Sequence, residues 1–167
     1  MNVRFKIGAR LLSDVRRDLH RQHPFAHERV GFLSAGLATY DGGVMVLARE
    51  YRPVADEDYV RDRTVGAMMA PEAIRKAQEW ALLQRVAIFH VHTHGGLGIP
   101  SFSGVDLREN PKFVPDFLKV APQNLHGAIV LSGDAAFGQF WAKRHTDAED
   151  LSDFVEVGSA LRYWGRA

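Results

Sequence analysis

Residues 87–110, AIFHVHTHGGLGIPSFSGVDLREN, place three histidines at every second position, His90, His92 and His94. The run before the glycines is apolar and rich in β-branched residues, which predicts a buried strand. Side chains two apart in a strand point to the same face, so His92 and His94 present their imidazoles in one direction. The glycines that follow permit a tight loop that returns Asp106 to the strand end. Two imidazoles and a carboxylate suit a catalytic zinc site, which has three protein ligands and a water.

Structural roles for the same residues remain open alternatives. A single histidine on a strand is more often a hydrogen-bonded core or surface residue than a metal ligand. Several imidazoles on one buried face are costly to desolvate without a partner, whereas a divalent ion would use them. Ser103 and Asp106 also fit a helix cap and a first-turn acid. The two roles are compatible, because a cap would fix the loop that delivers Asp106.

Composition excludes several classes of site. The 167 residues include no cysteine, which rules out disulfides, thiolate zinc sites and cysteine nucleophiles. The 21 Lys and Arg balance 20 Asp and Glu without a long run of one sign, so we expect no nucleic-acid partner. Charges interrupt the apolar residues of the opening segment, which argues against a signal peptide or a membrane span. We therefore expect a cytoplasmic protein with no membrane partner.

Hydrophobic periodicity predicts an α/β protein in which residues 1–167 form one domain. We expect a strand at 3–7, a helix within 10–22, a hairpin of 29–40 and 44–54, a helix over 71–85, a strand over 86–94, a short helix opened by 103–109 and a hairpin of 126–133 and 136–144. Residues 55–70 are polar and irregular. Residues 153–164 fit either a strand or a short helix.

The histidine and serine motifs resemble a known family. His92-Thr93-His94, eight further residues and then SGVD at 103–106 are similar to the H-x-H…S-x-x-D signature of the JAMM metalloproteases, also called MPN or JAB domains. That family has a catalytic glutamate upstream in the pattern E-x-x-G-x-L, which ERVGFL at 28–33 matches. Two features depart from the family: Gly95 stands where a proline usually follows the second histidine, and the loop to Asp106 is one residue longer than in many eukaryotic members.

The resemblance implies a single MPN (JAB) domain with a central mixed β-sheet flanked by helices, and it implies a role for each matched residue. His92, His94 and Asp106 would bind one Zn²⁺ per chain. Glu28 would act as the general base and then pass its proton to the leaving amine. Ser103 would stabilise the oxyanion. Outside this family pattern, the role to expect for Glu28 is that of a solvent-facing residue at a strand start, because glutamates are mostly exposed.

His90 does not fit the spacing of the motif. It supports the ligands, lines a groove or is structural, and we favour the structural role. The remaining histidines, His20, His23, His27, His126 and His145, lie in polar or loop contexts and are predicted to be solvated.

The activity implied by the resemblance is zinc-dependent cleavage, by an isopeptidase or peptidase, after the C-terminus of a ubiquitin-like protein. Compact bacterial members often accompany ubiquitin-like modification systems, including antiviral ones, so activating and conjugating enzymes are expected partners. Residues 56–63 and 112–123 are candidates for the substrate groove. Two alternatives stay open: a zinc hydrolase of a small molecule or short peptide, and a non-catalytic MPN scaffold. Amidohydrolases also begin from an H-x-H strand, but their barrel needs ~250 residues.

Overall fold

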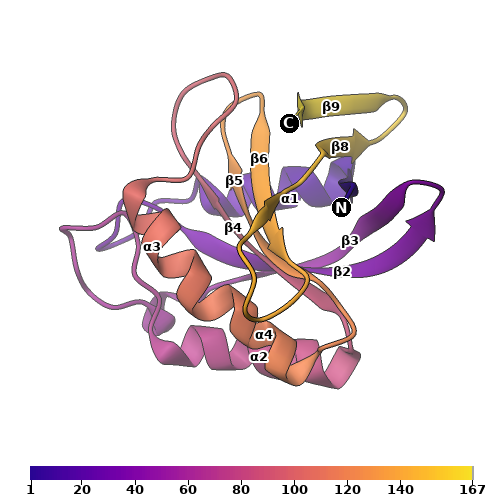
Figure 1. Ribbon diagram of the computed structural model, residues 1–167. Helices are drawn as coiled ribbons and strands as arrows, with labels where there is room; N and C mark the ends of the chain where they lie inside the picture. The colour runs from indigo at the N-terminus through magenta and orange to yellow at the C-terminus, as the bar shows by residue number, and fades with distance from the viewer. Residues whose placement is uncertain (167) are drawn as a thin grey trace.

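A computed structural model describes residues 1–166 and shows a mixed α/β protein built on one large curled sheet (Figure 1). The sheet has nine strands in the order β7-β6-β5-β4-β2-β3-β1-β8-β9. The strands are β1 (Val3–Gly8), β2 (Val30–Tyr40), β3 (Gly43–Pro53), β4 (Ala87–Thr93), β5 (His126–Leu131), β6 (Ala136–Trp141), β7 (Glu149–Asp150), β8 (Asp153–Val157) and β9 (Leu161–Arg166). The helices are α1 (Ala9–Leu19), α2 (Pro71–Gln84), α3 (Gly104–Phe113) and α4 (Phe117–Val120), with 3-10 turns at Asp56–Asp58 and Val114–Asp116.

Strand β4 lies in the interior of the sheet. It pairs antiparallel with β2, where His92 faces Val30, and parallel with β5, where His92 faces Val130. Strand β1 runs parallel to both β3 and β8, so the sheet is mixed, as the family resemblance implied. The sheet curls until β6 contacts β8 and β9.

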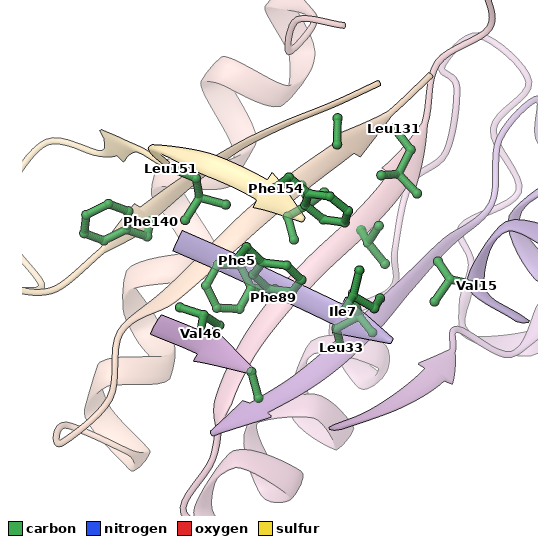
Figure 2. Close-up of a cluster of buried hydrophobic side chains, with 14 of the residues drawn as sticks. Phe5, Ile7, Val15, Leu33, Val46, Phe89, Leu131, Phe140, Leu151 and Phe154 are labelled. Atoms are coloured by element: carbon green, nitrogen blue, oxygen red, sulfur yellow. The ribbon is translucent and has the colours of Figure 1, made fainter. Parts of the chain in front are cut away.

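The concave side of the curled sheet holds the larger hydrophobic core, together with α1 (Figure 2). The Phe5 ring lies edge-on to Phe89 with centroids 5.0 Å apart, and it stacks on Phe154 at 5.1 Å. Burial of each such phenylalanine contributes about 1.5–3 kcal/mol to folding. These aromatic contacts fix β1, β4 and β8 relative to one another.

The opposite face of the sheet is covered by α2 and α4, which bury Trp80, Ile88 and Phe117. Side chains of β4 therefore alternate between two cores: Phe89 and Val91 face the concave side, and Ile88 faces the helices. His90 and His92 continue the series of Ile88. This alternation directs both imidazoles toward the helical layer rather than into the concave core.

Most predicted elements are confirmed, including both hairpins and the helix that begins at Pro71. Residues 153–164, which the sequence left open between strand and helix, belong to a hairpin of β8 and β9 that extends the sheet beyond β1. Helix α1 ends at Leu19, earlier than the periodicity suggested. In residues 1–166, no helix has both the length and the apolar character that crossing a membrane requires.

Candidate metal centre

His92 and His94 lie at the end of β4, on the same face, as the alternation predicted. Their Nε2 atoms are 3.2 Å apart. His92 is almost completely buried, and the His94 side chain is 24% exposed. The pairing of β4 on both edges holds His92 firmly, while His94 follows the last residue of the strand.

Asp106 reaches these imidazoles from the first turn of α3. Its Oδ2 lies 3.4 Å from His92 Nε2 and 3.5 Å from His94 Nε2. The turn is fixed by a capping box, in which the Ser103 backbone N–H donates to Asp106 Oδ2 at 2.8 Å and Ser103 Oγ accepts from the Asp106 backbone N–H at 3.2 Å. The proposed ligand is therefore also the N3 residue of the capping box.

The three donor atoms form a triangle with sides of 3.2, 3.4 and 3.5 Å. Zinc binds imidazole nitrogen and carboxylate oxygen at about 2.0–2.1 Å in a tetrahedron, which separates neighbouring ligand atoms by about 3.3–3.4 Å. The triangle has the size that such an ion needs, so the residues fit the group that the motif implies.

Asp106 is ionised at neutral pH. Burial acts to raise the pKa of its carboxyl, but the hydrogen bond and charge of His92, together with hydrogen bonds from Ser103, outweigh this effect. The net result is a pKa well below the ordinary range of an aspartic acid. The carboxylate is thus available as an anionic ligand without prior deprotonation.

The Ser103 hydroxyl is already engaged. It donates to Asp106 Oδ2 at 2.7 Å. Because a hydroxyl has a single hydrogen, the same group cannot donate to an oxyanion at the same time. The structure shows Ser103 as the residue that orients Asp106; its role toward an oxyanion stays a prediction.

Glu28 lies just before β2, at the edge of the site. Its backbone N–H donates to the Gly66 carbonyl at 2.9 Å, as does the N–H of His27. Its carboxylate packs directly on the Gly66 α-carbon, since a Cβ built there would stand 2.6 Å from Glu28 Oε2. No sequence pattern pointed to Gly66, because the contact joins two segments separated by a whole hairpin.

Two cavities meet at Glu28. One, of about 370 Å³, is also lined by His92 and Asp106. The other, of about 610 Å³, is also lined by His94. Glu28 thus borders one cavity with His92 and Asp106 and another with His94, so the structure brings Glu28 and the three proposed ligands together.

His90 is buried beside the triangle and outside it. Its ring stacks on His92 with centroids 5.3 Å apart, and neither ring nitrogen has a hydrogen-bond partner. Burial, and then the charge of His92, lower the pKa of His90 to about 3, so the ring is neutral. Its ring borders the cavity of about 370 Å³.

The glycine loop between His94 and Ser103 is held by the turn that joins β5 and β6. The Gly133 N–H donates to the Gly96 carbonyl at 2.9 Å, and the Gly98 N–H donates to Asp134 Oδ1 at 2.7 Å. Ser132 Oγ donates to the Gly98 carbonyl at 2.7 Å. Gly96 and Gly98 have φ of +95° and +84°, where glycine is favoured, whereas Gly95 lies outside that region. The sequence did not reveal this support, since the hairpin turn lies far along the chain.

The two segments predicted as groove candidates are placed differently. Asp56, Tyr59 and Arg61 line a separate hollow that includes none of the proposed ligands. In the second segment, Phe113 lines the cavity of about 370 Å³, and Phe117 is buried under α2.

One histidine prediction is wrong. His126 is completely buried, not solvated. Its Nδ1 accepts from the Ile88 N–H at 3.1 Å, and its Nε2 lies 3.2 Å from the Ala121 carbonyl. These backbone partners satisfy both nitrogens and make burial possible. His20, His27 and His145 are exposed, and His23 is partly buried.

Comparisons with known proteins identify no family for the chain. No protein-family model matches it, and no curated protein matches it. Among solved structures, a similar chain is the Trichoplax adhaerens STIL N-terminal domain, with 15% identity and a TM-score of 0.38. The similarity covers 80% of this chain and 39% of that chain. So low a TM-score carries no argument about fold or function.

Proposed function

We propose that this chain is a zinc hydrolase of the JAMM type, a single MPN (JAB) domain that cuts a peptide or isopeptide bond after the C-terminus of a ubiquitin-like protein. The observation that supports it most is the triangle of His92 Nε2, His94 Nε2 and Asp106 Oδ2, with Glu28 bordering the cavities on both sides.

The residues divide the chemistry between them. When bound, zinc supplies Lewis acidity, which polarises a carbonyl and lowers the pKa of a water to ~7. The Glu28 carboxylate takes the proton of the attacking water as the new C–O bond forms. It then gives that proton to the amine nitrogen as the C–N bond breaks. Ser103 keeps Asp106 in its ligand position through the 2.7 Å hydrogen bond.

The two cavities favour an extended substrate. They occupy about 370 and 610 Å³ on either side of Glu28, which suits a chain that passes the ligands in an extended form. A ubiquitin-like tail has that form, and its conjugate would continue into the second cavity. Enzymes that activate and conjugate such a protein are the partners we expect, in a cytoplasmic setting and, by analogy, in a bacterial modification system.

Replacement of Glu28 tests the proposal. The Glu28→Gln variant should bind one zinc per chain and lose turnover of a ubiquitin-like fusion by at least ~100-fold, the low end of what a positioned acid or base contributes. The matched control is Glu79→Gln on the exposed face of α2, which should keep full turnover. Zinc is measured by elemental analysis and cleavage by gel or mass spectrometry. A wild-type protein that binds no zinc would favour a non-catalytic scaffold instead.

A further inference from the structure

The cavity of about 370 Å³ beside the proposed ligands has an unusual concentration of unpaired polar atoms. Within residues 1–166, eight buried side-chain nitrogen or oxygen atoms have no hydrogen-bond partner. Four of them belong to His90, His92 and Asn110: both ring nitrogens of His90, Nδ1 of His92 and Nδ2 of Asn110. All three residues line this one cavity.

Unpaired buried donors are expensive for a folded protein, and each one calls for an explanation. His90 is 5% exposed and Asn110 is 3% exposed, so bulk water does not satisfy either side chain. An apolar residue of similar size would avoid the penalty at both positions. The arrangement is consistent with polar groups kept in place for a ligand.

The charges around the cavity are already accounted for. Asp106 belongs to the ligand triangle, Glu28 is the general base of the proposed function, and Glu109 Oε1 pairs with Lys112 Nζ at 2.7 Å. No lysine or arginine lines the cavity. An anionic group would find no cation there apart from a metal held by the triangle, and a cationic group would have to pair with the Glu28 carboxylate, which the proposed function uses as its base. A neutral polar group is the best match.

The apolar residues that line the cavity indicate the remaining part of the ligand. Val30, Ile74, Val105 and Phe113 make much of the lining apolar, and Met68 and Met69 add flexible side chains that adapt to a ligand. Resting on the proposed function, we infer that this cavity is a specificity pocket for a carboxamide on an apolar stem, such as the side chain of a substrate glutamine next to the bond that is cut.

The hydrogen-bonding groups are complementary. Each ring nitrogen of His90 can form a hydrogen bond, as donor or acceptor according to the tautomer, and the Asn110 amide nitrogen offers two donors. If His92 binds a metal through Nε2, its Nδ1 carries a hydrogen and is a further donor. A carboxamide supplies an acceptor oxygen for such donors and an NH₂ group for the acceptor on His90.

Amino-acid probes test the pocket without any catalysis. N-acetyl-glutamine amide and N-acetyl-methionine amide have similar length, and only the first carries a carboxamide on its side chain. We expect the glutamine probe to bind the zinc-loaded full chain at least about ten-fold more tightly, in titrations followed by NMR. The lysine and glutamate counterparts should bind more weakly than glutamine. Equal affinity for glutamine and methionine, or preference for lysine, would overturn the inference.

Substitution of Asn110 and His90, which line the pocket, provides a second measurement. In Asn110→Leu, loss of an unpaired amide should raise the melting temperature and abolish the preference for glutamine. The control is Asn124→Leu, which removes an amide that donates to the Arg85 carbonyl at 3.1 Å; it should lower the melting temperature and leave the preference unchanged. His90→Phe should also remove the preference, which protects the test against misfolding of one variant. A preference that survives both Asn110→Leu and His90→Phe would contradict the pocket.

Failure of this inference and failure of the proposed function are distinguishable. Zinc binding and cleavage without a glutamine preference would leave the hydrolase in place and remove the pocket. Preference for the glutamine probe in a protein that cleaves no ubiquitin-like fusion would keep the pocket as a binding site and remove the hydrolase.

Discussion

Two buried histidines on neighbouring strands have opposite surroundings. His126 opens β5 and uses both ring nitrogens on backbone groups of Ile88 and Ala121. His90, on β4, is equally inaccessible, and neither of its nitrogens is paired. The region around His126 satisfies its polar atoms, as a structural region does, whereas the region around His90 concentrates unpaired atoms beside the candidate metal centre. Burial alone does not distinguish these two histidines; their hydrogen-bond partners do.

The largest expected effect comes from removal of a proposed ligand in the second region, the one around His90 and the candidate metal centre. His94→Ala should reduce zinc affinity by more than about 100-fold, beyond the range typical for loss of a residue that only supports a ligand. The side chain is partly exposed, so the fold should survive. Zinc content after dialysis, with circular dichroism for folding, measures both. The control His145→Ala, at an exposed loop position, should keep its zinc. Zinc retained by His94→Ala would contradict the role of His94 as a ligand and, with it, the contrast between the two regions.

A smaller effect is expected from Gly66→Ala, which acts on Glu28 without touching the ligands. A Cβ at Gly66 would stand 2.6 Å from Glu28 Oε2, so the carboxylate must move. Displacement of a catalytic group by about 1 Å can slow a reaction by ~100-fold. We expect a loss of that order in kcat with unchanged zinc content.

Two controls isolate this mechanism. Gly8→Ala, whose added Cβ meets nothing within 4 Å, should be silent. In a Glu28→Gln background, Gly66→Ala should cause no further loss of kcat, because its effect passes through Glu28. Additive losses would show that Gly66 acts by another route.

The smallest expected effect concerns the pH dependence of stability in the first region, the one around His126. Burial lowers the pKa of His126 to about 4, from an ordinary value of 6.5. Between these pH values the unfolded chain binds a proton that the folded chain does not, so stability falls as pH falls through this window. His126 should thus account for about 2 kcal/mol of the stability lost between pH 7.5 and pH 5.

His126→Gln should reduce that loss by about the same amount, ~2 kcal/mol, since glutamine can pair with the same backbone groups and does not titrate. Urea unfolding at pH 7.5 and at pH 5 measures this loss of stability in both proteins. Zinc content should not change. An unaltered pH dependence would show that His126 is not the group responsible.

The sequence predicted those parts of the molecule that depend on local pattern. Alternation in residues 86–94 located β4 and the shared face of His92 and His94, and the cap signal at Ser103 located the start of α3. Long-range contacts were not predictable in this way. The support of the glycine loop by Ser132 and Asp134, and the packing of Glu28 on Gly66, depend on segments that only the folded sheet brings together.

The wrong prediction for His126 has the same origin. The segment shortly before it, PQN at 122–124, is polar and turn-like, which suggested solvent. Its partners, the N–H of Ile88 and the carbonyl of Ala121, are backbone atoms with no signature in side-chain pattern. Backbone groups near the start of β4 and at the end of α4 therefore explain why this residue is buried.

The capping box of α3 has a consequence for how the chain acquires an ion. Asp106 Oδ2 closes the first helical turn through Ser103 and also faces both imidazoles. If the triangle binds an ion, ion binding and formation of the first turn of α3 are linked equilibria, because the capping box already holds the carboxylate in position. A bound ion would in turn oppose fraying of the helix. Hydrogen exchange of the first amides of α3 would report that linkage directly.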